Sequence, residues 1–172
     1  MIQFAGLKDG LHRFTYEVGD EFFDSFEQTL VTGGNVHVTL DLDKQSDHLN
    51  LHFSFAGSMH VDCDRCLASA PFPIKGTSNL IIQLQSGDSD DADIIYLSSD
   101  AYQYNIAQYL YETLALSLPL RLVPCETSGD MSICDQEVIA KLEALSVSEP
   151  AIEEEAPTDP RWDALKKLSG DK

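Results

Sequence analysis

The sequence predicts an α+β fold in which an antiparallel β meander packs against one long helix and short C-terminal helices follow. Two observations carry this prediction. Apolar and polar residues alternate over 36–43 and again over 49–55, which is the pattern of strands with one buried and one solvated face. Residues 102–118 instead repeat apolar side chains at helical spacing, and Pro119 ends that pattern.

Two elements are expected before these clearest strands. Residues 11–18 alternate polar and apolar side chains, which predicts a half-buried strand. Residues 20–27 carry three phenylalanines at helical spacing, and Asp20 is a residue type that caps helix N-termini. The glycine pair at 33–34 is expected to end this short helix before the sheet begins.

Turns are expected to divide the central part of the chain into successive strands. The polar segment 44–47 predicts a hairpin between the two clearest strands. The Ala-Gly-Ser sequence at 56–58 predicts a second tight turn, so that a third strand follows and ends at Cys63. The prolines at 71 and 73 predict an irregular start to another strand, which runs over 77–84.

The remaining elements complete a single domain over residues 1–145. A short strand is expected at 94–97, and the long helix follows with an apolar face that Leu116 broadens. A loop that holds two cysteines leads into a second helix at about 134–145. Residues 146–158 then have the acidic, proline-containing composition of a linker.

Residues 159–172 predict a C-terminal docking helix. Asp159 is a good N-cap, and Pro160 suits the first helical position. A helix of about three turns is marginally stable alone, so this segment is expected to need a surface on which to dock. Its apolar stripe consists of Trp162, Leu165 and Leu168.

The charge of the chain limits its partners. The 172 residues carry a formal net charge of −18, so the surface as a whole repels phosphate and disfavours generic nucleic-acid binding. Residues 126–160 contribute −9 of this charge, whereas residues 161–172 are net basic at +2. The sequence contains no apolar stretch of membrane-spanning length and no signal-peptide pattern, so an acidic cytoplasmic protein without membrane contact is expected.

The four cysteines carry the clearest chemical signal. Cys63 and Cys66 form a C-x-x-C turn at the end of a predicted strand, and Cys125 and Cys134 lie in a later loop, so together they predict a four-thiolate zinc site. The second pair lacks zinc-ribbon spacing, and buried or free thiols remain the alternative. A redox pair would sit at a helix N-terminus, which the flanking sequence does not predict. No nucleotide-binding or hydrolase motif occurs, and no enzymatic activity is predicted.

Three motifs in a fixed order resemble one family. They are the CDRC turn at 63–66, the segment ETLALSLPLRLVPC at 112–125 and the C-terminal DPRWDALKKL at 159–168. In this order they resemble the YceD family of bacterial large ribosomal RNA subunit accumulation proteins, formerly a domain of unknown function. In that pattern Cys63 and Cys66 match a central cysteine pair, whereas the second cysteine cluster is reduced here to two widely spaced thiols.

The resemblance implies a non-catalytic ribosome-biogenesis factor that supports accumulation or processing of large-subunit ribosomal RNA. The implied partners are that RNA, a basic ribosomal protein, or both, with no small-molecule substrate. The alternative is a purely protein-binding module that holds a structural zinc or free thiols and makes no RNA contact. Because basic residues are scarce, those beside the motifs and the apolar anchors of the last helix are the candidate contacts. They are Arg65, Arg121, Arg161, Trp162, Leu165, Lys166 and Lys167.

Overall fold

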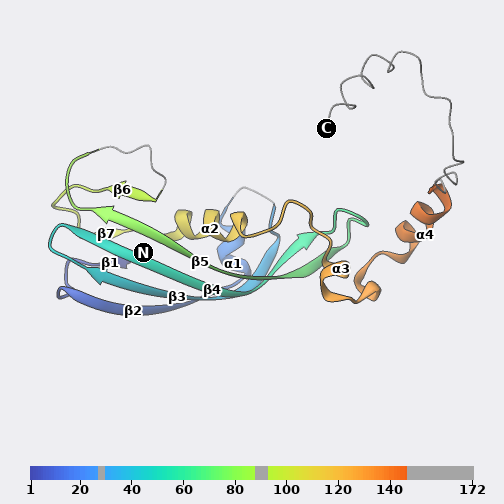
Figure 1. The fold of residues 1–172 in the computed structure, drawn as a ribbon, viewed down its shortest axis with the longest axis horizontal. Helices are drawn as coiled ribbons and strands as arrows, with labels where there is room; N and C mark the ends of the chain where they lie inside the picture. The colour runs from blue at the N-terminus through green and yellow to red at the C-terminus, as the bar shows by residue number, and fades with distance from the viewer. Residues whose placement is uncertain (27–29, 88–92, 147–172) are drawn as a thin grey trace, which may run out of the picture. The chain divides into compact units, whose positions relative to one another are not determined.

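The computed structural model describes residues 1–26, 30–87 and 93–146, and the chain divides into two units, 1–139 and 140–172. The first unit holds the strands and the beginning of the last helix (Figure 1). In chain order the elements are β1 (Ile2–Gln3), β2 (Gly10–Val18), α1 (Asp20–Asp24), β3 (Gly33–Lys44), β4 (His48–Asp62), β5 (Ser69–Gln83), β6 (Ile94–Tyr96), β7 (Gln103–Tyr104), α2 (Ala107–Leu116), α3 (Pro124–Ser128), the 3₁₀ helix η1 (Met131–Ile133) and α4 (Gln136–Leu145).

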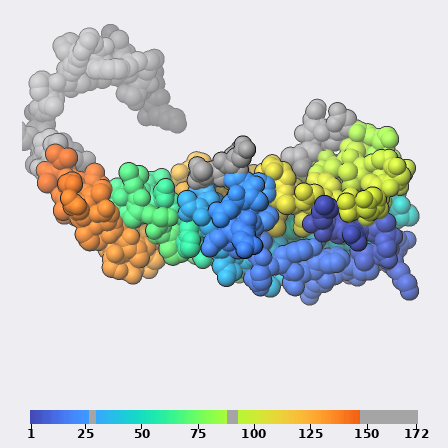
Figure 2. Space-filling model, turned by 180° about the vertical axis from the view of Figure 1, so that it is seen from behind, coloured from blue at the N-terminus to red at the C-terminus, as the bar shows by residue number. Residues whose placement is uncertain are grey.

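The main sheet has the order β2-β3-β4-β5-β6. Its first four strands pair antiparallel with their chain neighbours, which confirms the predicted meander. β6 pairs parallel with β5, so the sheet is mixed rather than wholly antiparallel. A separate two-stranded sheet pairs β1 with β7, and the dark blue N-terminal residues accordingly lie beside the yellow residues around β7 (Figure 2).

β4 continues through the glycine at which a turn was predicted. Gly57 pairs with Val36 of β3 and with Ile74 of β5, in unbroken register. A Cβ atom at this position would lie 2.7 Å from the Cα atom of Val36 and still closer to the carbonyl oxygen of Asn35. The glycine is therefore required by the close approach of a neighbouring strand, and the prediction of a turn at 56–58 is wrong.

β5 also begins earlier than predicted, because Pro71 and Pro73 lie inside it. Among the described residues, β6 pairs only with the end of this strand, from Ile81 onward, so the earlier part of β5 is an edge there. A proline at a strand edge removes no ladder hydrogen bond when its nitrogen faces away from the neighbouring strand. The two prolines thus belong to a regular strand rather than to an irregular segment before it.

The core lies on one face of this sheet, as the alternation predicts. Helices α1 and α2 share that face, and the rings of Phe26 and Tyr111 stack there with a centroid separation of 4.2 Å. Fully buried side chains come from alternate positions of each central strand, so burial follows the period of two. The predicted buried residues of β3 and β4 are Val36, Val38, Leu40, Leu42, Leu49, Leu51, Phe53 and Phe55, and all are buried.

α2 is shorter than the long helix predicted over 102–118. It spans ten residues, because Gln103 and Tyr104 pair with the N-terminal strand instead of joining the helix. Leu114 is fully buried, but Leu116 is 84% exposed and does not broaden the apolar face. No helix in the described part of the chain is long and apolar enough to cross a membrane.

α1 is likewise shorter than predicted, and Asp20 has a different role. The helix spans five residues and its N-cap is Gly19, which makes no side-chain cap. Asp20 is its first residue, and its Oδ1 accepts a hydrogen bond of 2.8 Å from the backbone N–H of Gly34. The carboxylate therefore ties α1 to the start of β3.

Candidate functional site

The four cysteines meet in a small cluster that is separate from the main core. All four are buried as free thiols, and Val123 and Ile139 pack with them. Cys63 follows β4, Cys66 lies in the turn before β5, Cys125 lies in α3 and Cys134 follows η1. We call these six residues the cysteine cluster. The fold thus brings together two cysteine pairs that are distant in the sequence.

A tight turn positions the first pair. The backbone N–H of Leu67 donates to the carbonyl of Cys63 at 2.8 Å, and the N–H of Cys63 donates to the carbonyl of Ala68 at 3.0 Å. Leu67 has a φ of 60°, in the left-handed region that side chains other than glycine seldom adopt, and it is 78% exposed. An exposed leucine in this conformation indicates that the surrounding hydrogen bonds dictate the shape of the turn.

Short helices, rather than an irregular loop, position the second pair. α3 starts with Pro124 at its first turn and ends at Gly129, whose φ of 72° suits a left-handed C-cap. Asp130 then caps η1 by accepting from the N–H of Ser132 at 2.9 Å. The side chain of Gln136 donates to the carbonyl of Cys134 at 3.2 Å, which connects α4 to this segment.

Asp64 holds the two cysteine segments side by side. Its backbone N–H donates to the carbonyl of Leu122 at 2.8 Å, and its Oδ2 accepts from the N–H of Leu122 at 2.6 Å. These two bonds join residues that are 58 positions apart, and this clasp places the C-x-x-C turn next to the residues that precede Cys125. The role of Asp64 is not predictable from the sequence, because an aspartate in such a turn carries no local signal for a distant backbone partner.

We therefore expect Asp64→Ala to lower the free energy of unfolding by about 1–3 kcal/mol, because it leaves the N–H of the buried Leu122 without its charged acceptor. Urea denaturation followed by circular dichroism measures this change. Asp64→Asn keeps an acceptor oxygen and should retain most of the stability. Asp62→Ala, at an exposed position two residues earlier, is the matched control and should change stability by less than about 0.5 kcal/mol. Equal losses for the Asp62 and Asp64 variants would contradict the clasp.

The sulfur atoms differ in their hydrogen-bond environments. The backbone N–H groups of Ala68 and Asp135 donate to the sulfur of Cys66, and the first of them is the main cause that lowers the pKa of this thiol. Burial raises the pKa of Cys63, although the N–H groups of Arg65 and Cys66 donate to its sulfur. The hydrogen bond with Cys125 is the main cause that raises the pKa of Cys134 to about 12.

The cluster holds thiols rather than a finished metal centre. Within the described ranges, no group of three or more His, Cys, Asp or Glu side chains has the geometry of a metal site. The redox alternative also lacks its setting, because Cys63 and Cys66 lie between two strands and not at a helix N-terminus. Zinc binding by the four cysteines remains a prediction.

Two of the predicted contact residues come together beside the cluster. Arg121 Nη2 lies 3.2 Å from Glu126 Oε1, and Arg65 Nη1 lies 4.0 Å from the same oxygen. The side chain of Arg121 is 70% exposed, whereas that of Arg65 is half-buried. One carboxylate thus faces two guanidinium groups beside the cysteine cluster. We call Arg65 and Arg121 the arginine pair.

The other predicted contacts belong to the C-terminal helix expected over 159–172. That helix and the linker expected over 146–158 lie outside the described residues, apart from Ser146. The same holds for five predicted contact residues, namely Arg161, Trp162, Leu165, Lys166 and Lys167.

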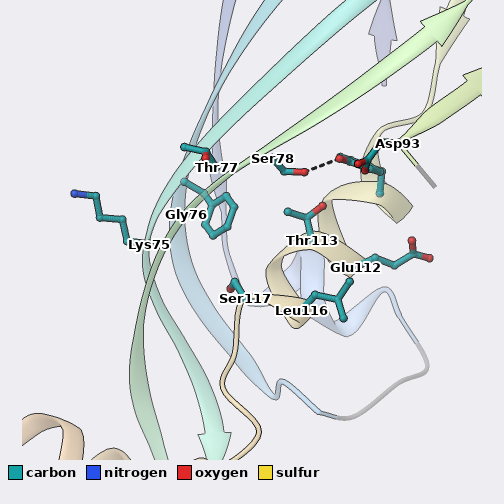
Figure 3. A pocket seen from close by; sticks show the side chains of 11 residues that line it. Lys75, Gly76, Thr77, Ser78, Asp93, Glu112, Thr113, Leu116 and Ser117 are labelled. Atoms are coloured by element: carbon teal, nitrogen blue, oxygen red, sulfur yellow. Dashed lines mark hydrogen bonds between the residues drawn. The ribbon is translucent and has the colours of Figure 1, made fainter. Parts of the chain in front are cut away.

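A groove of about 480 Å³ lies between β5 and α2, away from the cysteine cluster (Figure 3). Its walls combine apolar side chains such as Phe55 and Leu116 with hydroxyl groups from both elements and the side chains of Lys75 and Glu112. The hydroxyl of Tyr109 donates to the carbonyl of Asn79 at 2.7 Å and bonds Ser78 Oγ at 2.5 Å. These bonds hold α2 on the sheet. The lining contains no cysteine or histidine, and no motif in the sequence predicts this groove.

Comparison with known proteins agrees with the motifs. Residues 51–169 match the family described as "Large ribosomal RNA subunit accumulation protein YceD". The chain is also 27% identical over 127 residues to "Uncharacterized protein YlbN" of Bacillus subtilis (strain 168), which covers 73% of this chain and 69% of that protein. No solved structure is significantly similar. The family match covers more than half of the chain, including β5, α2 and the whole cysteine cluster, and the chain therefore belongs to the YceD family.

Proposed function

We propose that this chain is a non-catalytic ribosome-biogenesis factor that supports the accumulation of large-subunit ribosomal RNA. The observation that carries the proposal is the family match over residues 51–169, since the family description names RNA accumulation rather than a catalysed reaction. The proposed site of action is the cytoplasm, where ribosomes are assembled. The proposed partner is a basic ribosomal protein, large-subunit RNA, or both in one assembly.

The charge distribution supports a basic protein as the main partner. A formal net charge of −18 repels the RNA backbone and attracts the cationic surfaces that ribosomal proteins use to bind RNA. Two other cations of the described chain have partners within the fold. Arg13 pairs with Asp41 at 2.6 Å, and Lys44 donates to two backbone carbonyls. The arginine pair is the surface that we propose for a limited RNA contact.

Deletion of the gene tests the proposal in the cell. The expected result is a lower ratio of large-subunit to small-subunit ribosomal RNA, which a plasmid copy of the full chain restores. Quantitative electrophoresis of total RNA measures this ratio. A ratio that stays at the wild-type value in the deletion strain, with ribosome profiles unchanged in sucrose gradients, would overturn the proposed function.

The double variant Arg65→Ala/Arg121→Ala tests the RNA contact. Cross-linking of this variant to large-subunit RNA should fall. Cross-linking of Arg13→Ala should not fall, because Arg13 is an equally exposed arginine on the edge strand β2, away from the arginine pair. Two contacted phosphates on single-stranded RNA predict a slope of about −1.4 in a plot of log affinity against log salt. If both variants cross-linked equally well, the RNA contact through the arginine pair would be contradicted, and the proposed partner would be a protein alone.

A further inference from the structure

We propose that Cys63, Cys66, Cys125 and Cys134 bind one zinc ion as a structural four-thiolate site, which fastens the α3–η1 segment to the turn between β4 and β5. This metal site is independent of the proposed role in RNA accumulation. The proposal rests on three observations: the convergence of all four cysteines of the chain, the N–H groups directed at their sulfur atoms, and the small apolar content of the cluster.

Convergence is the first observation. Every cysteine of the chain is buried in one cluster, although the two pairs come from segments on either side of β5 and α2. The thiols contact one another in a chain, from Cys63 to Cys66, from Cys66 to Cys134 and from Cys134 to Cys125. A tetrahedral zinc site with bonds of about 2.3 Å keeps its sulfur atoms roughly 3.8 Å apart. The bonds between Asp64 and Leu122 already hold the two segments side by side, so the proposed site closes by rotation of the cysteine side chains.

The N–H groups are the second observation. Four backbone N–H groups point at two sulfur atoms, those of Arg65 and Cys66 at Cys63 and those of Ala68 and Asp135 at Cys66. A neutral thiol is a weak acceptor, whereas a thiolate is a strong one and is the form that binds metals. The turn that directs these groups keeps Leu67 in a left-handed conformation at an exposed position. Cysteines that served only as small core residues would not need this arrangement.

The third observation is how little apolar surface holds the second segment. In the described part of the chain, the cluster contains two buried aliphatic side chains besides the cysteines, those of Val123 and Ile139, and only the partly buried Ala68, Ile133 and Val138 pack against it. Small units with so little core generally need a disulfide or a metal to fix them. The thiols are free and the cluster joins two distant segments, which is the work that a structural zinc performs.

In the binding reaction, Zn²⁺ and four thiols give one zinc tetrathiolate and release four protons. The reaction needs no oxidant or reductant. The product carries two negative charges, and Arg65 lies within the C-x-x-C turn, between Cys63 and Cys66. Thiolates select zinc over magnesium and calcium, which prefer oxygen ligands. Iron also binds four thiolates, so the test must measure both metals.

The test uses the full chain, purified under reducing conditions without chelator. Native mass spectrometry and elemental analysis should find one zinc and no iron per chain. The double variant Cys125→Ser/Cys134→Ser should lose the zinc. The matched control His60→Gln, which removes an exposed potential ligand of β4, should keep it. A zinc-free chain that takes up no zinc on titration, an iron-loaded chain, zinc retained by the cysteine variant, or zinc lost from the histidine variant would each overturn the proposal.

A second measurement covers the case in which the cysteine variant fails to fold. The wild-type chain, stripped of metal, is titrated with Co²⁺ and followed by absorption. A tetrathiolate site should give intense visible bands and a strong near-ultraviolet thiolate-to-cobalt band that saturate at one equivalent, and Zn²⁺ should displace them. Absence of the thiolate-to-cobalt band in the folded protein would overturn the proposal, whatever the variants do.

Discussion

Leu114→Ala should lower the free energy of unfolding by about 2–5 kcal/mol, the range found for buried leucines whose site collapses only partly. Leu114 lies in α2 with no exposed surface, on the side of the helix that packs against the sheet. The substitution removes apolar contacts and leaves a cavity, while alanine itself favours the helix. Urea denaturation at constant temperature measures the change, with the urea dependence expected to stay the same.

Leu116→Ala is the matched control for this prediction. It makes the same substitution in the same helix two residues later, but Leu116 is 84% exposed. Its effect should stay within about 0.5 kcal/mol, because a surface substitution removes little buried area. If both variants lost equal stability, the loss would not come from burial under α2, and the packing of this helix on the sheet would be contradicted.

Gly57→Ala should also destabilise the fold strongly and should lower the free energy of unfolding by at least about 1–3 kcal/mol. The added Cβ atom overlaps the backbone of Asn35 and Val36 in β3, and a strand backbone cannot move aside as a flexible side chain can. Thermal unfolding measured by circular dichroism reports the change. Because the overlap lies at the middle of β4, we also expect a lower yield of folded protein.

Gly6→Ala is the matched control for the glycine. No heavy atom lies within 4 Å of a Cβ atom added at Gly6, so alanine fits without displacement. Its stability should be unchanged or raised by about 0.4–1 kcal/mol, since alanine restricts the unfolded chain more than glycine does. A Gly57 variant as stable as the Gly6 variant would show that β3 and β4 do not approach as closely as the structure places them.

The periodic patterns of the sequence were sufficient to predict the central strands. Alternation identified the buried faces of β3 and β4 residue by residue, because side chains of a strand alternate between its faces whatever the strand pairs with. The family, too, was evident from three motifs and is confirmed by the match over residues 51–169. The four cysteines could be identified as a set from the sequence, because the chain has only four of them and thiolates are typical zinc ligands.

The errors in prediction occurred where a distant segment decides the local structure. The turn expected at Gly57 does not form, because the glycine is needed to make room for β3 and continues the strand. The helix expected from residue 102 begins at Ala107, because Gln103 and Tyr104 pair with β1 at the other end of the sequence. A glycine and a helical periodicity are local signals, and neither indicates which distant residues will contact that position in the folded chain.

The candidate site shows the same division. The sequence by itself determined which chemical groups the site offers, namely four thiols with basic residues beside them, because residue types can be read without the fold. Only the tertiary structure decided that Cys63 and Cys66 meet Cys125 and Cys134, through the clasp between Asp64 and Leu122, and that Arg65 and Arg121 face one carboxylate. Contacts between residues 58 positions apart depend on which polar groups find partners when the whole chain folds, and no periodic pattern in the sequence encodes that choice.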